Sequence, residues 1–266
     1  TKKGNFSKNI YVSNVLATNN KRQGMSIISA RNVQVDNSIF QNTIGTLPGA
    51  GLDLEPNNKY DRLENISFSN CVFQNNDHAG VVLALSKLES DSRPVDIKFM
   101  NCFIQSNHNE SNKYIAGEIV LSAHKTRPVE GQVVFENCII KNSQWGLFYS
   151  RKTNDAYTVT FRNCSAIDIC RDESYPAIYL EVPDYYKGSY TLGGYVFDNL
   201  YVRYDTNIEL FQVRGSQLNT LAHLSDITGK IILGKNTPKN FKYIKYNPKN
   251  NQEVNLEVLY KTFEGN

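Results

Sequence analysis

Residues 68–75 read FSNCVFQN, and the same phrase returns at 99–106 as FMNCFIQS and at 135–142 as FENCIIKN. Four further copies occur at 12–19, 35–42, 161–168 and 197–204. The third residue is asparagine in every copy, and successive asparagines are 23, 33, 31, 36, 26 and 36 residues apart. Such repetition indicates a solenoid, in which one small unit is stacked many times along the chain.

A second phrase follows each asparagine and often begins with glycine, as in GMSIIS at 24–29, GLDLEP at 51–56 and GVVLAL at 80–85. Equivalent phrases begin at 117, 146, 177 and 208. Both phrases are short, rich in Val, Ile, Phe and Tyr, and bounded by turn residues, which is typical of short strands. Their irregular spacing excludes fixed-length repeats. We therefore predict an all-β, parallel β-helix of about seven to eight coils over 1–215, with irregular strands over 216–266 capping its core.

The asparagines are expected to form one column at a bend, because asparagine tolerates left-handed backbone. The next position forms a second column, of Ser38, Cys71, Cys102, Cys138, Cys164 and Leu200. Four cysteines in one register fit either a metal or redox site or a column of small buried side chains. We favour the second interpretation, because cysteine packs well in a narrow core, and no metal site is predicted.

Composition narrows the class of protein. A net charge of +3 and 21% charged residues, without a basic cluster among aromatic side chains, argue against a nucleic-acid partner. No apolar run reaches the roughly eighteen residues that membrane insertion requires. The chain starts at Thr1 without an export signal, and its first strand lacks a cap. We expect further coils or domains to precede Thr1.

Over about residues 9–215, the asparagine column, the Phe-x-Asn-Cys phrases and the glycine-led strands resemble the pectate-lyase-like superfamily of right-handed parallel β-helices, the pectin lyase fold. Residues 21–57 are similar to a block found in bacterial and phage-borne β-helix proteins, including tailspike-like proteins. The resemblance implies a polysaccharide partner and a secreted protein in an extracellular, periplasmic or cell-surface location. The polygalacturonase motifs Asn-Thr-Asp, Gly-His-Gly and Arg-Ile-Lys are absent, so the resemblance does not extend to pectin cleavage. A glycoside hydrolase would need no cofactor, whereas a lyase would use Ca²⁺.

Strand alternation predicts which side chains of the glycine-led strands face outward. The first inward column would read Met25, Leu52, Val81, Gly117, Leu147, Ile178 and Ile208. The first outward column would then read Ser26, Asp53, Val82, Glu118, Phe148, Tyr179 and Glu209. Carboxylates and aromatic side chains share this outward face, which makes it the predicted polysaccharide groove.

Asp53 and Glu55 are the leading catalytic candidates. They lie about 6.6 Å apart along one strand and point the same way, and carboxyls about 6.5–9.5 Å apart serve as acid and base in inverting glycosidases. In a lyase, one of them would instead bind a cation or neutralise a uronate. A solvent-facing strand that carries two acids is the alternative. His78, as acid or base, and Arg22, as a substrate ligand, are expected at the bends on either side of them.

Five more residues are predicted to bind substrate. Glu118 would be a third carboxylate in the Asp53 column, and His124 and Arg151 would form a basic flank. Phe148 and Tyr179 would supply stacking platforms for sugar rings. These residues suit a carbohydrate-active enzyme, either a hydrolase or a lyase acting on a complex or anionic polysaccharide. They equally suit a non-catalytic glycan-binding or adhesion module, and a structural spacer is the third hypothesis, because the fold does not determine the activity.

Overall fold

The computed structural model of the chain describes residues 5–108, 117–183, 186, 188–216 and 221–261, and strands dominate it. The strands form two parallel sheets, one of 15 and one of 8 strands. The only helix among the described residues is the 3₁₀ turn η1 (Pro248–Asn250). The prediction of an all-β protein with parallel strand pairing is confirmed.

The larger sheet contains two stacks of strands that meet in one long strand, β19 (Tyr190–Arg203). The first stack also contains β1 (Ser7–Ser13), β4 (Ala30–Asp36), β7 (Leu63–Ser69), β10 (Val95–Met100), β13 (Gly131–Glu136), β16 (Thr158–Arg162), β21 (Ala222–Leu233) and β23 (Val254–Tyr260). The second contains β2 (Leu16–Thr18), β5 (Ile39–Gln41), β8 (Val72–Gln74), β11 (Phe103–Gln105), β14 (Ile139–Lys141) and β17 (Ser165–Ile167).

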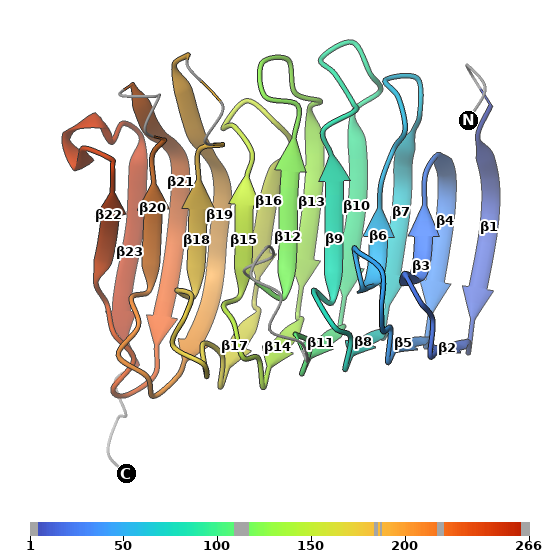
Figure 1. Cartoon of the computed structure of the whole chain (residues 1–266), viewed down its shortest axis with the longest axis horizontal. Helices are drawn as coiled ribbons and strands as arrows, with labels where there is room; N and C mark the ends of the chain where they lie inside the picture. The colour runs from blue at the N-terminus through green and yellow to red at the C-terminus, as the bar shows by residue number, and fades with distance from the viewer. Residues whose placement is uncertain (1–4, 109–116, 184–185, 187, 217–220, 262–266) are drawn as a thin grey trace.

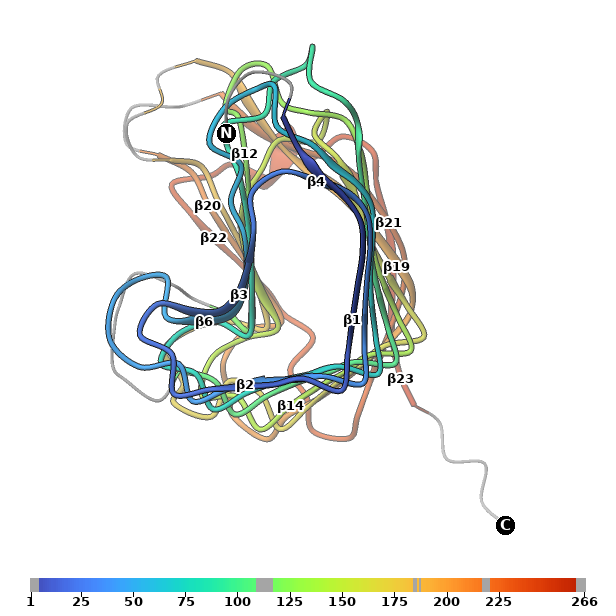
Figure 2. The same ribbon diagram turned by 90° about the vertical axis from the view of Figure 1, so that its right-hand side faces the viewer.

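The eight-stranded sheet is a third stack, and it is built from the glycine-led phrases. It contains β3 (Gln23–Ile27), β6 (Ala50–Leu54), β9 (Val81–Leu85), β12 (Ile119–Ala123), β15 (Phe148–Arg151), β18 (Ile178–Glu181), β20 (Phe211–Arg214) and β22 (Phe241–Ile244). From β1 to β16, each strand pairs in parallel with the strand three elements later, and β17 pairs with the second half of the long strand β19. Successive coils therefore lie over one another, as Figures 1 and 2 show, in an arrangement compatible with a parallel β-helix.

The repeated asparagine forms the bend between the first and second stacks. In all seven copies its φ angle is positive, from 50° in Asn37 to 62° in Asn199. Asparagine adopts this left-handed backbone more readily than other residues with a side chain. The predicted backbone role of the column is therefore confirmed. A stacked amide ladder appears at Gln41, Gln74 and Gln105, whose side chains are joined by hydrogen bonds of 2.8 and 2.7 Å.

The core lies inside the coils and is arranged in columns. Phe68, Phe99, Phe135 and Phe161 stack with centroid distances of 5.0, 4.6 and 5.0 Å. The cysteines are all buried and free, and those of the column donate to backbone oxygens, as Cys102 does to Phe68. The interpretation of this column as small core residues is confirmed.

The described residues 221–261 extend both sheets, because β21, β22 and β23 pair in parallel with their neighbours. An apolar cavity of about 290 Å³ lies at this end, between Phe211, Phe241 and Val258 among others. The division at residue 216 and the capping role of the last strands stay predictions. Among the described residues, no helix is both long and apolar enough to cross a bilayer.

Candidate functional site

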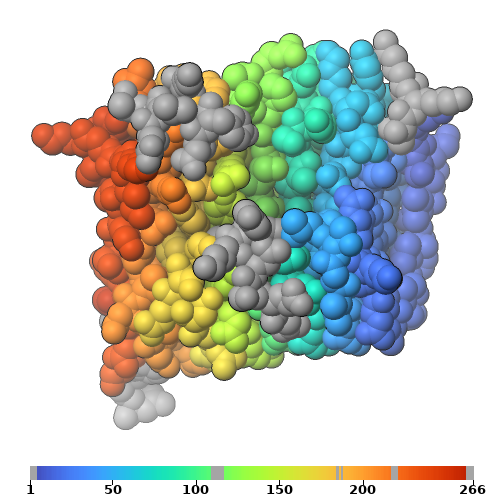
Figure 3. All heavy atoms as spheres, viewed as in Figure 1, coloured from blue at the N-terminus to red at the C-terminus, as the bar shows by residue number. Residues whose placement is uncertain are grey.

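The outward face of the eight-stranded sheet carries two columns of side chains, and this sheet faces the reader in Figures 1 and 3. The pairing register places Ser26, Asp53, Val82, Val120, Tyr149, Tyr179, Gln212 and Lys242 in the first column. The second column, two residues further along each strand, contains Glu55, Ala84, Ser122, Arg151, Glu181 and Arg214. We call these two columns the outer face.

The predicted register is correct for the first three coils and wrong for three later ones. Met25, Leu52 and Val81 pair as expected, but they continue into Ile119 and Phe148 rather than Gly117 and Leu147. Gly24, Gly51 and Gly80 directly precede the inward residue, whereas the glycines at 117 and 146 come one residue earlier. Alignment on the glycines therefore misplaces the phrases at 117 and 146. In the phrase at 208, which has no glycine, Phe211 takes the place predicted for Ile208.

Glu55 is the solvent-facing member of the predicted acid pair. Its Oε2 lies 3.1 Å from Nη2 of Arg22, and 45% of its side chain is exposed. Arg22 also donates from Nε to the backbone oxygen of Leu47 at 3.2 Å, which fixes its guanidinium group beside Glu55. The expected proximity of Arg22 to this pair is thus present.

Asp53 lies behind Glu55 and is only 1% exposed, so the prediction that both carboxyls project into solvent is wrong for Asp53. No donor in the described part of the chain reaches either of its oxygens. Burial, followed by the negative charge of the neighbouring Glu55, raises the pKa of Asp53 to about 7. The carboxyl of Asp53 therefore holds its proton up to near-neutral pH.

His78 is buried, at 2% exposure, and its ring packs against Gly49. Gly49 has a φ of +58°, and a Cβ atom there would lie 2.3 Å from Cδ2 of His78. The backbone amide of His78 donates to the Gly49 oxygen at 3.1 Å. His78 thus belongs to the packed bend beside the outer face. The prediction of a solvent-facing acid or base at His78 is therefore wrong.

Glu118 is not in the Asp53 column, because Val120 occupies that place. Its side chain is fully buried and accepts a 2.6 Å hydrogen bond from Nδ2 of Asn107, whose Oδ1 in turn accepts from Asn76 at 2.8 Å. Burial raises the pKa of Glu118 to about 7. The register prediction for Glu118 is therefore wrong, and its contacts are those of a structural polar ladder.

Phe148 also differs from the prediction, since its ring points into the core rather than outward. It is fully buried and stacks on Phe161 with a centroid distance of 5.4 Å. Its place on the outer face is taken by the next residue, Tyr149. Tyr179 does lie in the outer column, with its ring centroid 5.3 Å from that of Tyr149.

Glu181 organises the other end of the outer face. Its Oε2 accepts hydrogen bonds from the hydroxyl of Tyr149 and from Nε and Nη2 of Arg151, the latter two at 2.9 and 2.6 Å. Its Oε1 accepts from the Tyr179 hydroxyl at 3.3 Å and lies 3.5 Å from Nη1 of Arg214. Arg151 and Tyr179 were predicted as substrate ligands. Glu181, Tyr149 and Arg214 were not, because only a correct register shows that they converge.

His124 lies in the turn after β12 and is half-buried. Its Nδ1 accepts hydrogen bonds from the backbone amides of Thr126 and Arg127, at 3.3 and 3.1 Å. This geometry stabilises the turn. Nothing in these contacts connects His124 to the outer face.

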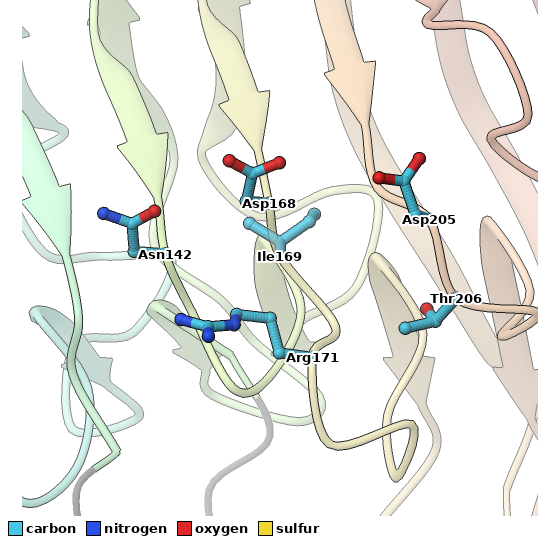
Figure 4. A pocket seen from close by; sticks show the side chains of 6 residues that line it. All are labelled: Asn142, Asp168, Ile169, Arg171, Asp205 and Thr206. Carbon is cyan, nitrogen blue, oxygen red and sulfur yellow. The ribbon is translucent and has the colours of Figure 1, made fainter.

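A separate hollow of about 430 Å³ lies where the chain leaves β14, β17 and β19, as Figure 4 shows. Its polar lining includes Asn142, Asp168, Arg171 and Asp205. Asp168 is already paired with Arg203 at 3.2 Å. Across the described residues, no group of three or more His, Cys, Asp or Glu side chains is arranged to hold a metal ion.

No protein-family model matches the chain, and neither does any curated protein or solved structure.

Proposed function

We propose that the chain is a right-handed parallel β-helix of the pectate-lyase-like superfamily, and that it cleaves a polysaccharide lying along the outer face of its eight-stranded sheet. The parallel winding, the left-handed asparagine column and the shared outer face support this proposal. A location outside the cytoplasm, either secreted or at the cell surface, belongs to the same proposal.

The observation that carries the catalytic part is the pairing of a buried carboxyl with an exposed one. Asp53 has a pKa near 7 and lies behind Glu55, which reaches solvent and is held by Arg22. A carboxyl group that keeps its proton near neutral pH can supply one for general acid catalysis. Glu55 is the exposed carboxyl that would touch the glycan and protonate its oxygen, and Asp53 is a positioning residue behind it that would return the proton.

The burial of Asp53 changes the mechanism expected from the sequence. An inverting hydrolase holds its carboxyls about 6.5–9.5 Å apart, with water between them, whereas Asp53 is 1% exposed and sealed from solvent. The proposed role of the pair is therefore to protonate the departing glycosidic oxygen. Hydrolysis and elimination both need that proton, so the pair is compatible with a hydrolase and with a lyase. In a lyase, Glu55 is the exposed carboxylate that would contact Ca²⁺, because Asp53 is buried.

Product release from a panel of polysaccharides tests this proposal. Reducing ends report hydrolysis, and absorbance of unsaturated uronates reports elimination. We expect Glu55→Gln to lower the rate at least about 10²-fold, the lower limit for loss of a general acid, and Asp53→Asn to move or abolish the pH optimum.

Asp198→Asn is the matched control, because Asp198 is also about half exposed, at 46%, and paired with arginine, Arg162, at 3.0 Å, but it lies on the larger sheet. Its rate should equal that of the unmodified chain. Equal rates for Glu55→Gln and the control would refute the catalytic proposal.

A non-catalytic glycan-binding or adhesion module is the second candidate. The near-complete burial of Asp53 favours it, since a sealed carboxyl needs a movement of its surroundings before substrate can reach it. Binding to a polysaccharide without product from any member of the panel would support this candidate over the enzyme.

A further inference from the structure

The apolar cavity of about 290 Å³ between the last strands of the two sheets has a cause in the sequence. In five successive coils, one inward position of the first stack is phenylalanine, at Phe68, Phe99, Phe135, Phe161 and Phe197. The pairing register continues from Phe197 to Gly229 of β21, and from there to Leu256 of β23, which lines the cavity. The ring that fills the core of each of those coils is therefore missing beside the cavity.

Gly229 cannot be given a side chain that would fill this space. Its φ angle is +106°, and a Cβ atom there would lie 2.2 Å from the backbone oxygen of Phe197. Any larger residue would collide with the neighbouring coil instead of reaching the cavity. The gap in the phenylalanine column is thus built into the backbone of β21.

The walls of the cavity come from both sheets and are almost entirely apolar. Phe211 of β20 and Phe241 of β22 stack with a centroid distance of 4.6 Å. The apolar and aromatic lining consists of Phe211, Leu224, Ile227, Phe241, Tyr243, Val254, Leu256 and Val258. A cavity of about 150 Å³ with walls of this kind stays dry and takes up benzene. The larger cavity therefore has room for an apolar group about twice that size.

Lys239 is the one charged side chain among the described residues that line the cavity. It is exposed, and in the described part of the chain it forms no ion pair, whereas Lys242 is paired with Glu209 at 3.1 Å. Asn251 also lines the cavity, and its Oδ1 accepts a 2.6 Å hydrogen bond from the Tyr246 hydroxyl. The remaining polar group of Asn251 is its NH₂ donor. The rim therefore offers one positive charge and hydrogen-bond donors.

We propose that this cavity binds a free medium-chain carboxylate, with the acyl chain inside and the carboxylate paired with Lys239. The apolar walls bury the chain, and the cation at the rim selects an anionic head group over a neutral or positive one. β22 lies six strand spacings, or about 29 Å, from β6. The site is thus separate from the proposed place of cleavage and does not depend on that proposal.

Three ligands with the same chain provide a direct test: octanoate, octanol and octylammonium. Binding to the unmodified chain is measured by calorimetry in moderate salt, which screens distant charges. We expect octanoate to bind at least about threefold more tightly than octylammonium, as an exposed ion pair allows. Equal binding of the two charged ligands, or no binding of octanoate, would overturn the proposal.

Lys239→Gln should lower the affinity for octanoate about two- to fivefold and leave the affinity for octanol unchanged. Lys235→Gln is the matched control, because Lys235 is also exposed and lies four residues away, but it does not line the cavity. Unchanged binding in Lys239→Gln would refute the pairing with Lys239, and so would equal losses in the two variants.

A series of carboxylates from hexanoate to tetradecanoate tests the cavity itself. Each added CH₂ group should raise the affinity about fourfold until the cavity is full, and further groups should add little. An affinity that rises without a plateau would indicate adsorption to the surface and would contradict a site of limited volume.

Val258→Phe fills the cavity from β23 and should lower the affinity for octanoate at least about tenfold. If this variant does not fold, the exposed Lys239→Gln and the chain-length series still decide the proposal. Light scattering tests the other possible occupant. If the unmodified chain forms a dimer that Val258→Phe dissociates, a second copy of the chain covers the cavity, and the carboxylate site is overturned.

Discussion

Replacing Asp53 by asparagine should change how the stability of the protein depends on pH. The pKa of Asp53 is raised from 3.8 to about 7 in the folded protein, so between these values the folded state holds a proton that the unfolded chain has lost. The free energy of unfolding must therefore fall as the pH rises through this interval. Asparagine cannot titrate, so Asp53→Asn should lack this part of the slope.

The size of the effect follows from the same interval. One pKa unit corresponds to about 1.36 kcal/mol, so the step from 3.8 to about 7 sets an upper limit of about 4 kcal/mol. The positive charge of Arg22 opposes the rise in the pKa of Asp53, so the measured value should be smaller. Between pH 5 and pH 8 only about two of these pKa units are crossed, so we expect a difference of about 1–3 kcal/mol between the two pH values.

Urea unfolding at pH 5 and pH 8 measures this difference. The single tryptophan, Trp145, is 4% exposed and reports unfolding by its fluorescence. Between pH 5 and pH 8, the unmodified chain should lose more stability than Asp53→Asn does, because the variant lacks the titration of residue 53. Parallel pH profiles for the two proteins would refute the assignment of a buried, proton-holding carboxyl to residue 53.

Three further substitutions test the packing around the outer face by urea unfolding. Phe148→Ala should lower the free energy of unfolding by about 3–5 kcal/mol, as loss of a buried ring does; a change below about 1 kcal/mol would place the ring outside the core. Asn107→Ala should lower the free energy of unfolding by about 1–3 kcal/mol, because the buried Glu118 would lose the hydrogen bond that Asn107 donates to it. An unchanged stability would show that this polar ladder does not stabilise the fold. Glu55→Gln should change stability by less than about 1 kcal/mol, since its ion pair with Arg22 is exposed; a large loss would assign Glu55 a structural role.

The parallel stacking of the coils could be predicted from the sequence, because the repeated asparagine and its neighbours depend on local backbone geometry alone. A bend that needs a positive φ selects asparagine whatever the length of the turns around it. The alternation of inward and outward side chains within one strand is equally local. It correctly placed Asp53 and Tyr179 on the outer face.

The register between coils was predicted less accurately than the strands themselves, because it depends on turns of unequal length. Gly117 and Gly146 precede the inward residue of their strands by one residue more than Gly80 does. The prediction therefore turned Phe148 to the wrong face and placed Glu118 in the Asp53 column, two residues short of Val120. The burial of Asp53 is a further property that strand alternation cannot supply. A side chain can point outward from its strand and still be covered by its surroundings.

The convergence around Glu181 was hidden for the same reason. Arg151 and Arg214 are 63 residues apart in the sequence, and they meet only because β15, β18 and β20 are adjacent in the sheet. The strand pattern in the sequence identifies each outward residue separately, without showing which residues of other coils lie beside it. Only the pairing of the strands shows that the two arginines share one carboxylate.

The position of a bound glycan is the sharpest test of the outer face as the place of cleavage. A crystal structure of Glu55→Gln soaked with an anionic oligosaccharide should show the sugar along the outer face, with one glycosidic oxygen within hydrogen-bond distance of residue 55. A sugar bound on the larger sheet, or at either end of the stack with the outer face empty, would contradict this placement.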